Sequence, residues 1–112
     1  MNTRQFSNKQ EMSVAKNLGG QVNSNSGAGK WRKGDVRVVD ASLLIECKTC
    51  TSDKSSFSIK EEWIKKNLEE AHSTQLFNTA IAFNFGPDKP NYYVINESLM
   101  KFLVEKLIEE NH

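Results

Sequence analysis

Three side chains near the middle of the sequence, Asp35, Glu46 and Lys48, have the types and spacing that metal-dependent chemistry requires. Carboxylate oxygens are the usual protein ligands of Mg²⁺, which keeps several waters and often bridges to phosphate oxygens. A bound metal activates water and stabilises charge on a phosphate, and a lysine can orient that water or neutralise the phosphate. The set predicts phosphodiester hydrolysis. The pattern Asp-x10-Glu-x-Lys is weak by itself, because Glu-x-Lys is common on ordinary solvated strands.

Residues 34–48 predict the hairpin that positions these groups. Apolar residues alternate on both sides of residues 40–42, as in two short strands joined by a tight turn. Pairing that is symmetric about this turn places Asp35 opposite Glu46, and Lys48 then projects from the same face as Glu46. Two opposed carboxylates destabilise a sheet unless a cation lies between them, which favours a metal site. The other face carries Val36, Val38, Leu43, Ile45 and Cys47.

A helix is expected near the N-terminus, from about Asn8 to Leu18. Ser7 and Gln10 have the spacing of a capping box, and the pair Gly19-Gly20 is a strong stop signal. Residues 1–6 are then a loose arm, in which Arg4 is a candidate phosphate contact.

Glu11 is a third carboxylate of interest, because it lies on the apolar stripe of this helix with Val14, Ala15 and Leu18. A carboxylate that faces inward is costly unless it is paired or coordinated. Two interpretations stay open: Glu11 faces the metal site, or it lies at the edge of the stripe and reaches solvent.

The segment between this helix and the hairpin is rich in Asn, Ser and Gly and ends in a basic cluster. Val22 begins an edge strand, and the residues up to Gly29 form a loop. Basic side chains next to an aromatic ring suit contact with a phosphate backbone; the residues are Lys30, Trp31, Arg32 and Lys33. A surface loop with chance charges is the alternative. The G-x-x-x-x-G-K-[ST] motif of nucleotide-binding loops is missing from the sequence, which excludes that class of NTPase.

Composition and charge describe one soluble globular domain spanning residues 1–112, which is 38% apolar and 26% charged. The net charge of +1 is unevenly distributed, since residues 1–60 carry ten Lys/Arg against five Asp/Glu and residues 61–112 carry five against nine. The positive half contains the candidate site, which suits a polyanionic partner.

The remaining expected DNA contacts are Arg37, Lys54 and Lys60. The sequence contains neither a membrane span nor a secretory signal, so we expect a cytoplasmic protein.

Two cysteines, Cys47 and Cys50, form a lone C-x-x-C. A structural zinc site needs four ligands, and only His72 and His112 remain to complete one. Since Cys47 falls on the apolar face of the hairpin, we interpret it as a buried small side chain.

The second half of the chain predicts two helices and two strands. A helix is expected over about Ile59–His72, with the stripe Ile64, Leu68 and Ala71 facing the core. Strands are expected over residues 76–85 and 91–95. Asn96 then caps a last helix that runs to about Glu110 and has an acidic end.

In this order, an inward Glu11, a Ser/Gly loop, Asp35 and Glu46-x-Lys48 resemble the PD-(D/E)xK nuclease superfamily. More narrowly, they resemble the archaeal-type Holliday junction resolvases and their phage-encoded relatives. The resemblance covers roughly residues 7–95, and the matching segments are Glu11, Asn25-Ser26-Gly27, Gly34-Asp35, Leu44-Ile45-Glu46-Cys47-Lys48 and Phe57-Ser58-Ile59.

The resemblance implies an α/β fold, in which a mixed central sheet flanked by helices forms a restriction-endonuclease-like core. It implies that Asp35 and Glu46 bind Mg²⁺, with Mn²⁺ as a substitute, and that Glu11 completes the acidic cluster. It further implies that Lys48 assists the attacking water and that Ser26 handles the scissile phosphate. Members act as homodimers on four-way junctions in DNA recombination and repair, in the host cytoplasm when phage-encoded.

The sequence departs from this family at two points. Gly34 stands where the superfamily has its proline, and the last helix has no clear counterpart. Three alternatives therefore stay open: a nuclease of the same fold with another DNA target, a DNA-binding module without catalysis, and a small interaction protein whose carboxylates are ordinary surface groups.

Overall fold

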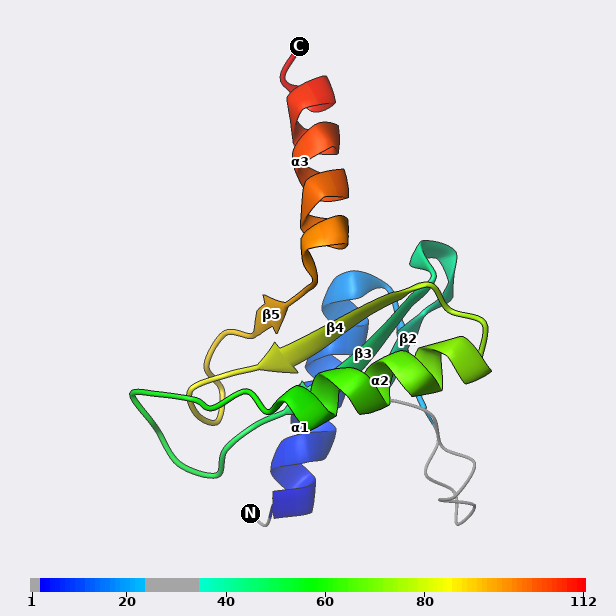
Figure 1. Ribbon diagram of the computed structural model, residues 1–112. Helices are drawn as coiled ribbons and strands as arrows, with labels where there is room; N and C mark the ends of the chain where they lie inside the picture. Colours follow the sequence, from blue (N-terminus) through cyan, green and yellow to red (C-terminus); the bar gives the residue numbers. More distant parts are fainter. Residues whose placement is uncertain (1–2, 24–34) are drawn as a thin grey trace.

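Five strands form one mixed sheet in the order β1-β2-β3-β4-β5, with helix α1 on one face and α2 on the other (Figure 1). The computed structural model describes residues 3–23 and 35–112, without the side chains of Thr3 and Arg4. The elements are α1 (Thr3–Leu18), β1 (Gln21–Val22), β2 (Val36–Val38), β3 (Leu43–Lys48), α2 (Glu61–Ser73), β4 (Asn78–Phe83), β5 (Tyr92–Val94) and α3 (Glu97–Glu110). The expected mixed α/β sheet flanked by helices is confirmed.

The hairpin of β2 and β3 has the predicted register. Val36 pairs with Ile45 and Val38 with Leu43. Asp35 directly precedes this ladder, and its amide donates to the Ile45 carbonyl at 3.1 Å. A turn of 3₁₀ helix joins the strands, and Ser42 closes it in the left-handed region at φ 52°.

A parallel crossover through α2 places β4 beside β3, with Lys48 opposite Phe83. The carboxyl ends of both strands therefore meet at one edge of the sheet. β5 then pairs antiparallel with β4 and places Tyr92 opposite Phe83 on its other side.

Alternation along the strands divides the core between the two faces. Under α1, Val14 and Ala15 pack against Val36, Ile45 and further buried strand residues. Under α2, Leu44 packs with Ala71 and Leu76. Because Glu46 and Lys48 alternate with Ile45 and Cys47, their side chains lie on the α2 face.

Helix α1 ends where the sequence predicted and begins earlier. Gly19 is left-handed at φ 69°, and the amide of Gly20 donates to the Ala15 carbonyl at 2.8 Å, which closes a Schellman motif. The expected loose arm over residues 1–6 is wrong for residues 3–6, which are helical. These residues include no Gly or Pro to stop the helix, and Phe6 is half-buried.

Helix α2 corrects the sequence prediction in two ways. It begins at Glu61 instead of Ile59, and its first residue follows an extended Lys60 without a side-chain cap. Its buried residues are Asn67 and Ala71, whereas Leu68, expected in the core, is 40% exposed. The Asn67 amide is accommodated because it donates to the carbonyls of Leu44 and Ala80, at 3.3 and 3.2 Å.

Helix α3 begins at the predicted cap, where Asn96 Oδ1 accepts from the Leu99 amide at 2.8 Å. It projects away from the sheet (Figure 1), and all of its residues except the half-buried Leu99 are exposed. Within the described residues, no helix is both long and apolar enough to cross a membrane.

Candidate active site

The hairpin brings Asp35, Glu46 and Lys48 together at the carboxyl end of β3. Lys48 Nζ lies 3.3 Å from Glu46 Oε2, and the two side chains are only 30% and 19% exposed. Asp35 lies close enough to raise the pKa of Glu46 electrostatically. The structure therefore brings these three charged groups close together, while their role as a site stays a prediction.

The carboxyl group of Glu46 is electrostatically disfavoured in its charged form. Burial is the largest cause that raises its pKa above 4.5, and the charge of Asp35 is the second. Lys48 acts in the opposite direction through its charge and a hydrogen bond, without reversing the shift. A cation held between the carboxylates would relieve this repulsion.

Asp35 is oriented by the backbone of the strand it faces. Its Oδ2 accepts from the Cys47 amide at 2.7 Å, and its own amide donates to the Ile45 carbonyl at 3.1 Å. These bonds fix the carboxyl group beside β3, in reach of Glu46. Two hard carboxylate oxygens held in this way fit the ligand preference of Mg²⁺, and Asp35 and Glu46 are the residues that would hold it.

Trp63, at the start of α2, is a site residue that the sequence reasoning did not identify. Lys48 Nζ lies 4.5 Å from the centre of its ring, and Lys60 Nζ lies 5.8 Å from it. Cation–π attraction and the ion pair with Glu46 thus hold the Lys48 ammonium from two sides. The spacing of Trp63 and Asn67, four residues apart on α2, was the available signal.

Glu70, one turn after Asn67 on the same side of α2, is a second site residue that the sequence reasoning did not identify. Its side chain is 15% exposed and lies 4.0 Å from Lys66. Its charge makes the smallest of the contributions that raise the pKa of Glu46. The α2 face of the site is therefore more acidic than the hairpin alone predicts.

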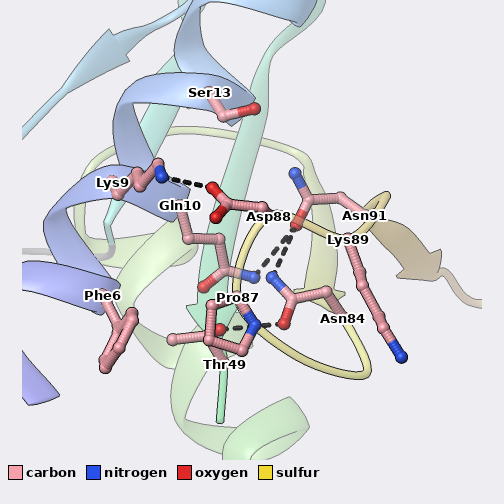
Figure 2. A pocket seen from close by; sticks show the side chains of 10 residues that line it. All are labelled: Phe6, Lys9, Gln10, Ser13, Thr49, Asn84, Pro87, Asp88, Lys89 and Asn91. Atoms are coloured by element: carbon pink, nitrogen blue, oxygen red, sulfur yellow. Dashed lines mark hydrogen bonds and ion pairs between the residues drawn. The ribbon is translucent and has the colours of Figure 1, made fainter. Parts of the chain in front are cut away.

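Behind Lys48, on the α1 face, polar side chains line a pocket of about 220 Å³ (Figure 2). Gln10 is 5% exposed, and its Nε2 donates to the Lys48 carbonyl at 2.8 Å and to Asn91 Oδ1 at 3.2 Å. Thr49 donates to Asn84, and Asn84 donates to Asn91. This network ties α1 to the end of β3, so that Gln10 positions the backbone that carries Lys48.

Glu11 is 6% exposed, which confirms that it faces inward. It belongs to the helix on the opposite face of the sheet from the Glu46 side chain. Within the described residues, the structure contains no group of three or more His, Cys, Asp or Glu side chains that could hold a metal ion. Participation of Glu11 in an acidic cluster therefore stays a prediction.

The expected DNA contacts are only partly described. Arg37 is half-buried on the face of Glu46, and its Nε is buried without a hydrogen-bond partner in the described part of the chain. Lys54 and Lys60 are exposed near the carboxyl edge of the sheet. Several other candidates lie outside the described residues: Ser26, Lys30, Trp31, Arg32, Lys33 and the side chain of Arg4.

Comparison with known proteins gives no relative. The chain matches no protein-family model, no curated protein and no solved structure.

Proposed function

We propose that the protein is a Mg²⁺-dependent endodeoxyribonuclease with a restriction-endonuclease-like core, which cuts branched DNA, above all four-way junctions, as a homodimer. The observation that carries the proposal is the set of Asp35, Glu46 and Lys48. The two carboxylates lie close enough at the end of a hairpin for the charge of Asp35 to raise the pKa of Glu46, and Lys48 is ion-paired with Glu46. A fold gains no stability from two neighbouring carboxylates of this kind.

Each residue of the set has a distinct role. Asp35 and Glu46 hold the metal, which when bound supplies an activated water and stabilises charge on the scissile phosphate. Mn²⁺ is the expected substitute. Lys48 donates hydrogen bonds to the attacking water or to a phosphate oxygen. Trp63 holds the Lys48 ammonium on the face of the sheet from which Glu46 projects.

Basic residues around the site support DNA as the substrate. Arg37 pairs with Leu44 on the neighbouring strand and forms no ion pair among the described residues, and Lys60 shares the Trp63 ring with Lys48. Arginine and lysine side chains contact phosphates in a sequence-independent way, which suits an enzyme that recognises DNA shape.

Helix α3 supports the homodimer. Large apolar side chains on it are each more than 40% exposed; they are Met100, Phe102, Leu103, Val104, Leu107 and Ile108. A helix of 14 residues is about 21 Å long, and an exposed apolar surface of this extent marks an interaction site. A groove of about 830 Å³ at its base, between β3, β4 and α3, extends the apolar surface. A second copy of the chain brings an identical helix and groove, so paired copies cover both.

The test is cleavage of a synthetic four-way junction and a linear duplex, each with Mg²⁺ and with EDTA. We expect paired nicks near the branch point that require Mg²⁺. Asp35→Asn should lower the cleavage rate by about 10²-fold or more, the typical value of a lost electrostatic stabiliser. Junction binding should be retained, because a negative charge is removed.

The control is Glu69→Gln, which likewise replaces a carboxylate by an amide, at an exposed position of α2, and should cut normally. Normal cutting by Asp35→Asn would exclude the metal site. Equal cutting of duplex and junction would retain the nuclease with another DNA target. Tight binding without any cutting would indicate a DNA-binding module.

A further inference from the structure

Aromatic side chains gather next to the site, at the carboxyl edge of the sheet. Lys48, Phe83 and Tyr92 are direct neighbours across β3, β4 and β5, so their side chains project from the same face. The rings of Phe83 and Tyr92 lie 5.9 Å apart, and Phe57 connects Phe83 to Trp63 with centroid distances of 5.2 and 6.3 Å. A continuous row of rings therefore leads from Lys48 to Tyr92.

The row ends in an open hollow of about 310 Å³, which we call the Tyr92 hollow. Its lining residues are Lys54, Ser55, Phe85, Lys89, Pro90 and Tyr92. The rings of Phe85 and Tyr92 lie 5.8 Å apart at an interplanar angle of 65°, and Tyr92 is 53% exposed. Small-molecule sites range upward from about 300 Å³, so the hollow has room for one flat ring on Tyr92.

Two lysines, Lys54 and Lys89, line the hollow. Lys54 is exposed, forms no ion pair with any described residue, and is held in place because its amide donates to the Phe85 carbonyl at 2.7 Å. Lys89 also lines it and lies 3.7 Å from the exposed Asp53. An aromatic ring flanked by lysines is the arrangement with which proteins bind unpaired nucleotides: the base stacks and the phosphates meet the cations.

We propose that the Tyr92 hollow binds one unpaired base of the DNA strand, stacked on Tyr92, with Lys54 and Lys89 at the adjoining phosphates. The proposal rests on the proposed nuclease function and specifies its substrate as DNA with an unpaired base close to the cut. Tyr92 lies two strand spacings from Lys48, roughly 10 Å. At about 3.4 Å per nucleotide, this distance corresponds to about three nucleotides.

The experiment measures binding in EDTA, so that it does not depend on cleavage. The probes are a fluorescently labelled thymidine oligonucleotide, a duplex of the same length, and a four-way junction. Tyr92→Ala should weaken single-strand binding by about 5- to 100-fold, the range for one stacked base, and duplex binding much less. Tyr92→Phe should bind like the wild type, because it keeps the ring. Lys54→Ala should reduce the salt dependence of single-strand binding.

The matched control is Phe77→Ala, which removes an aromatic ring that is 85% exposed just before β4, at the opposite end of the sheet; its binding should be unchanged. Unchanged single-strand affinity of Tyr92→Ala would overturn the proposal. Equal loss of duplex and single-strand binding would also overturn it, and would make Tyr92 a packing residue. A selective Tyr92 effect without metal-dependent cleavage would retain the hollow and reject the nuclease. Metal-dependent cleavage without any effect of Tyr92→Ala would retain the nuclease and reject the Tyr92 hollow as a base-binding site.

Discussion

At the scale of single residues, the site is organised around a carboxylate that the fold disfavours. Glu46 is largely buried, lies near the charge of Asp35, and has Lys48 as its one counter-ion among the described residues, so its pKa is raised. A raised carboxyl pKa means that the ionised group costs folding free energy. The protonated Glu46 therefore contributes to the stability of the fold. This contribution is fully present below pH 4.5, and it is lost as the pH rises through the raised pKa of Glu46.

Glu46→Gln should therefore raise the melting temperature of the metal-free protein at pH 7, and the difference should shrink as the pH falls below 4.5. Mg²⁺ should reverse the order, because it stabilises only the protein that binds it. Thermal melts at several pH values, with EDTA or Mg²⁺, measure both effects. Glu69→Gln, at an exposed position of α2, is the control and should show neither. A variant less stable than the wild type at pH 7 in EDTA would contradict the account.

At the scale of elements, the contact of α2 with the sheet depends on an amide. Asn67 is 1% exposed and joins the helix to β3 and β4 through the carbonyls of Leu44 and Ala80. The same face of α2 carries Trp63 and Glu70 toward the site. The position of Asn67 thus sets how α2 presents these side chains to Lys48 and Glu46.

Asn67→Asp keeps the shape and replaces the donor by a carboxylate that faces two carbonyl oxygens. An uncompensated buried charge costs about 3–5 kcal/mol, so at pH 7 the melting temperature should fall by more than about 10 °C. The loss should be smaller near pH 4, where the acid can be protonated. Gln75→Glu makes the same change at an exposed position and should cost less than about 0.5 kcal/mol. An equally small loss for both variants would mean that the Asn67 bonds do not hold α2.

At the scale of the whole molecule, one helix stands apart from the fold. The sheet and the helices α1 and α2 bury each other, whereas α3 extends away with its apolar side chains exposed (Figure 1). An isolated helix of this length is marginal in water, since most helical stability in proteins comes from packing. In the proposed homodimer, a second copy of the chain would supply the missing packing surface.

Leu107→Glu places a charge on the apolar surface of α3, where Leu107 is 61% exposed. We expect a monomer by sedimentation velocity over a concentration series in which the wild type is a dimer. Paired nicking of junctions should be lost in the same variant. Lys101→Glu changes the charge of an exposed, polar position on α3 and should remain dimeric. A monomeric wild type over the whole series would exclude the α3 dimer.

The sequence alone determined the features that depend on near neighbours. Alternation on both sides of a short turn set the register of the hairpin, in which Val36 pairs with Ile45, because side chains on a strand alternate with period two. Gly19 and Asn96 marked a helix end and a helix start through local backbone bonds.

Only the tertiary structure decided the features that depend on distant segments. The parallel crossover, with α2 between its strands, placed Phe83 and Tyr92 beside Lys48, and no local pattern encodes that register. The tertiary structure also determined that Asn67 is buried and Leu68 is exposed. The carbonyls of Leu44 and Ala80, which accept from the Asn67 amide, come together only in the assembled sheet. The apolar stripe of α3 was visible in the sequence, but its lack of cover became clear only when the rest of the core was complete without it.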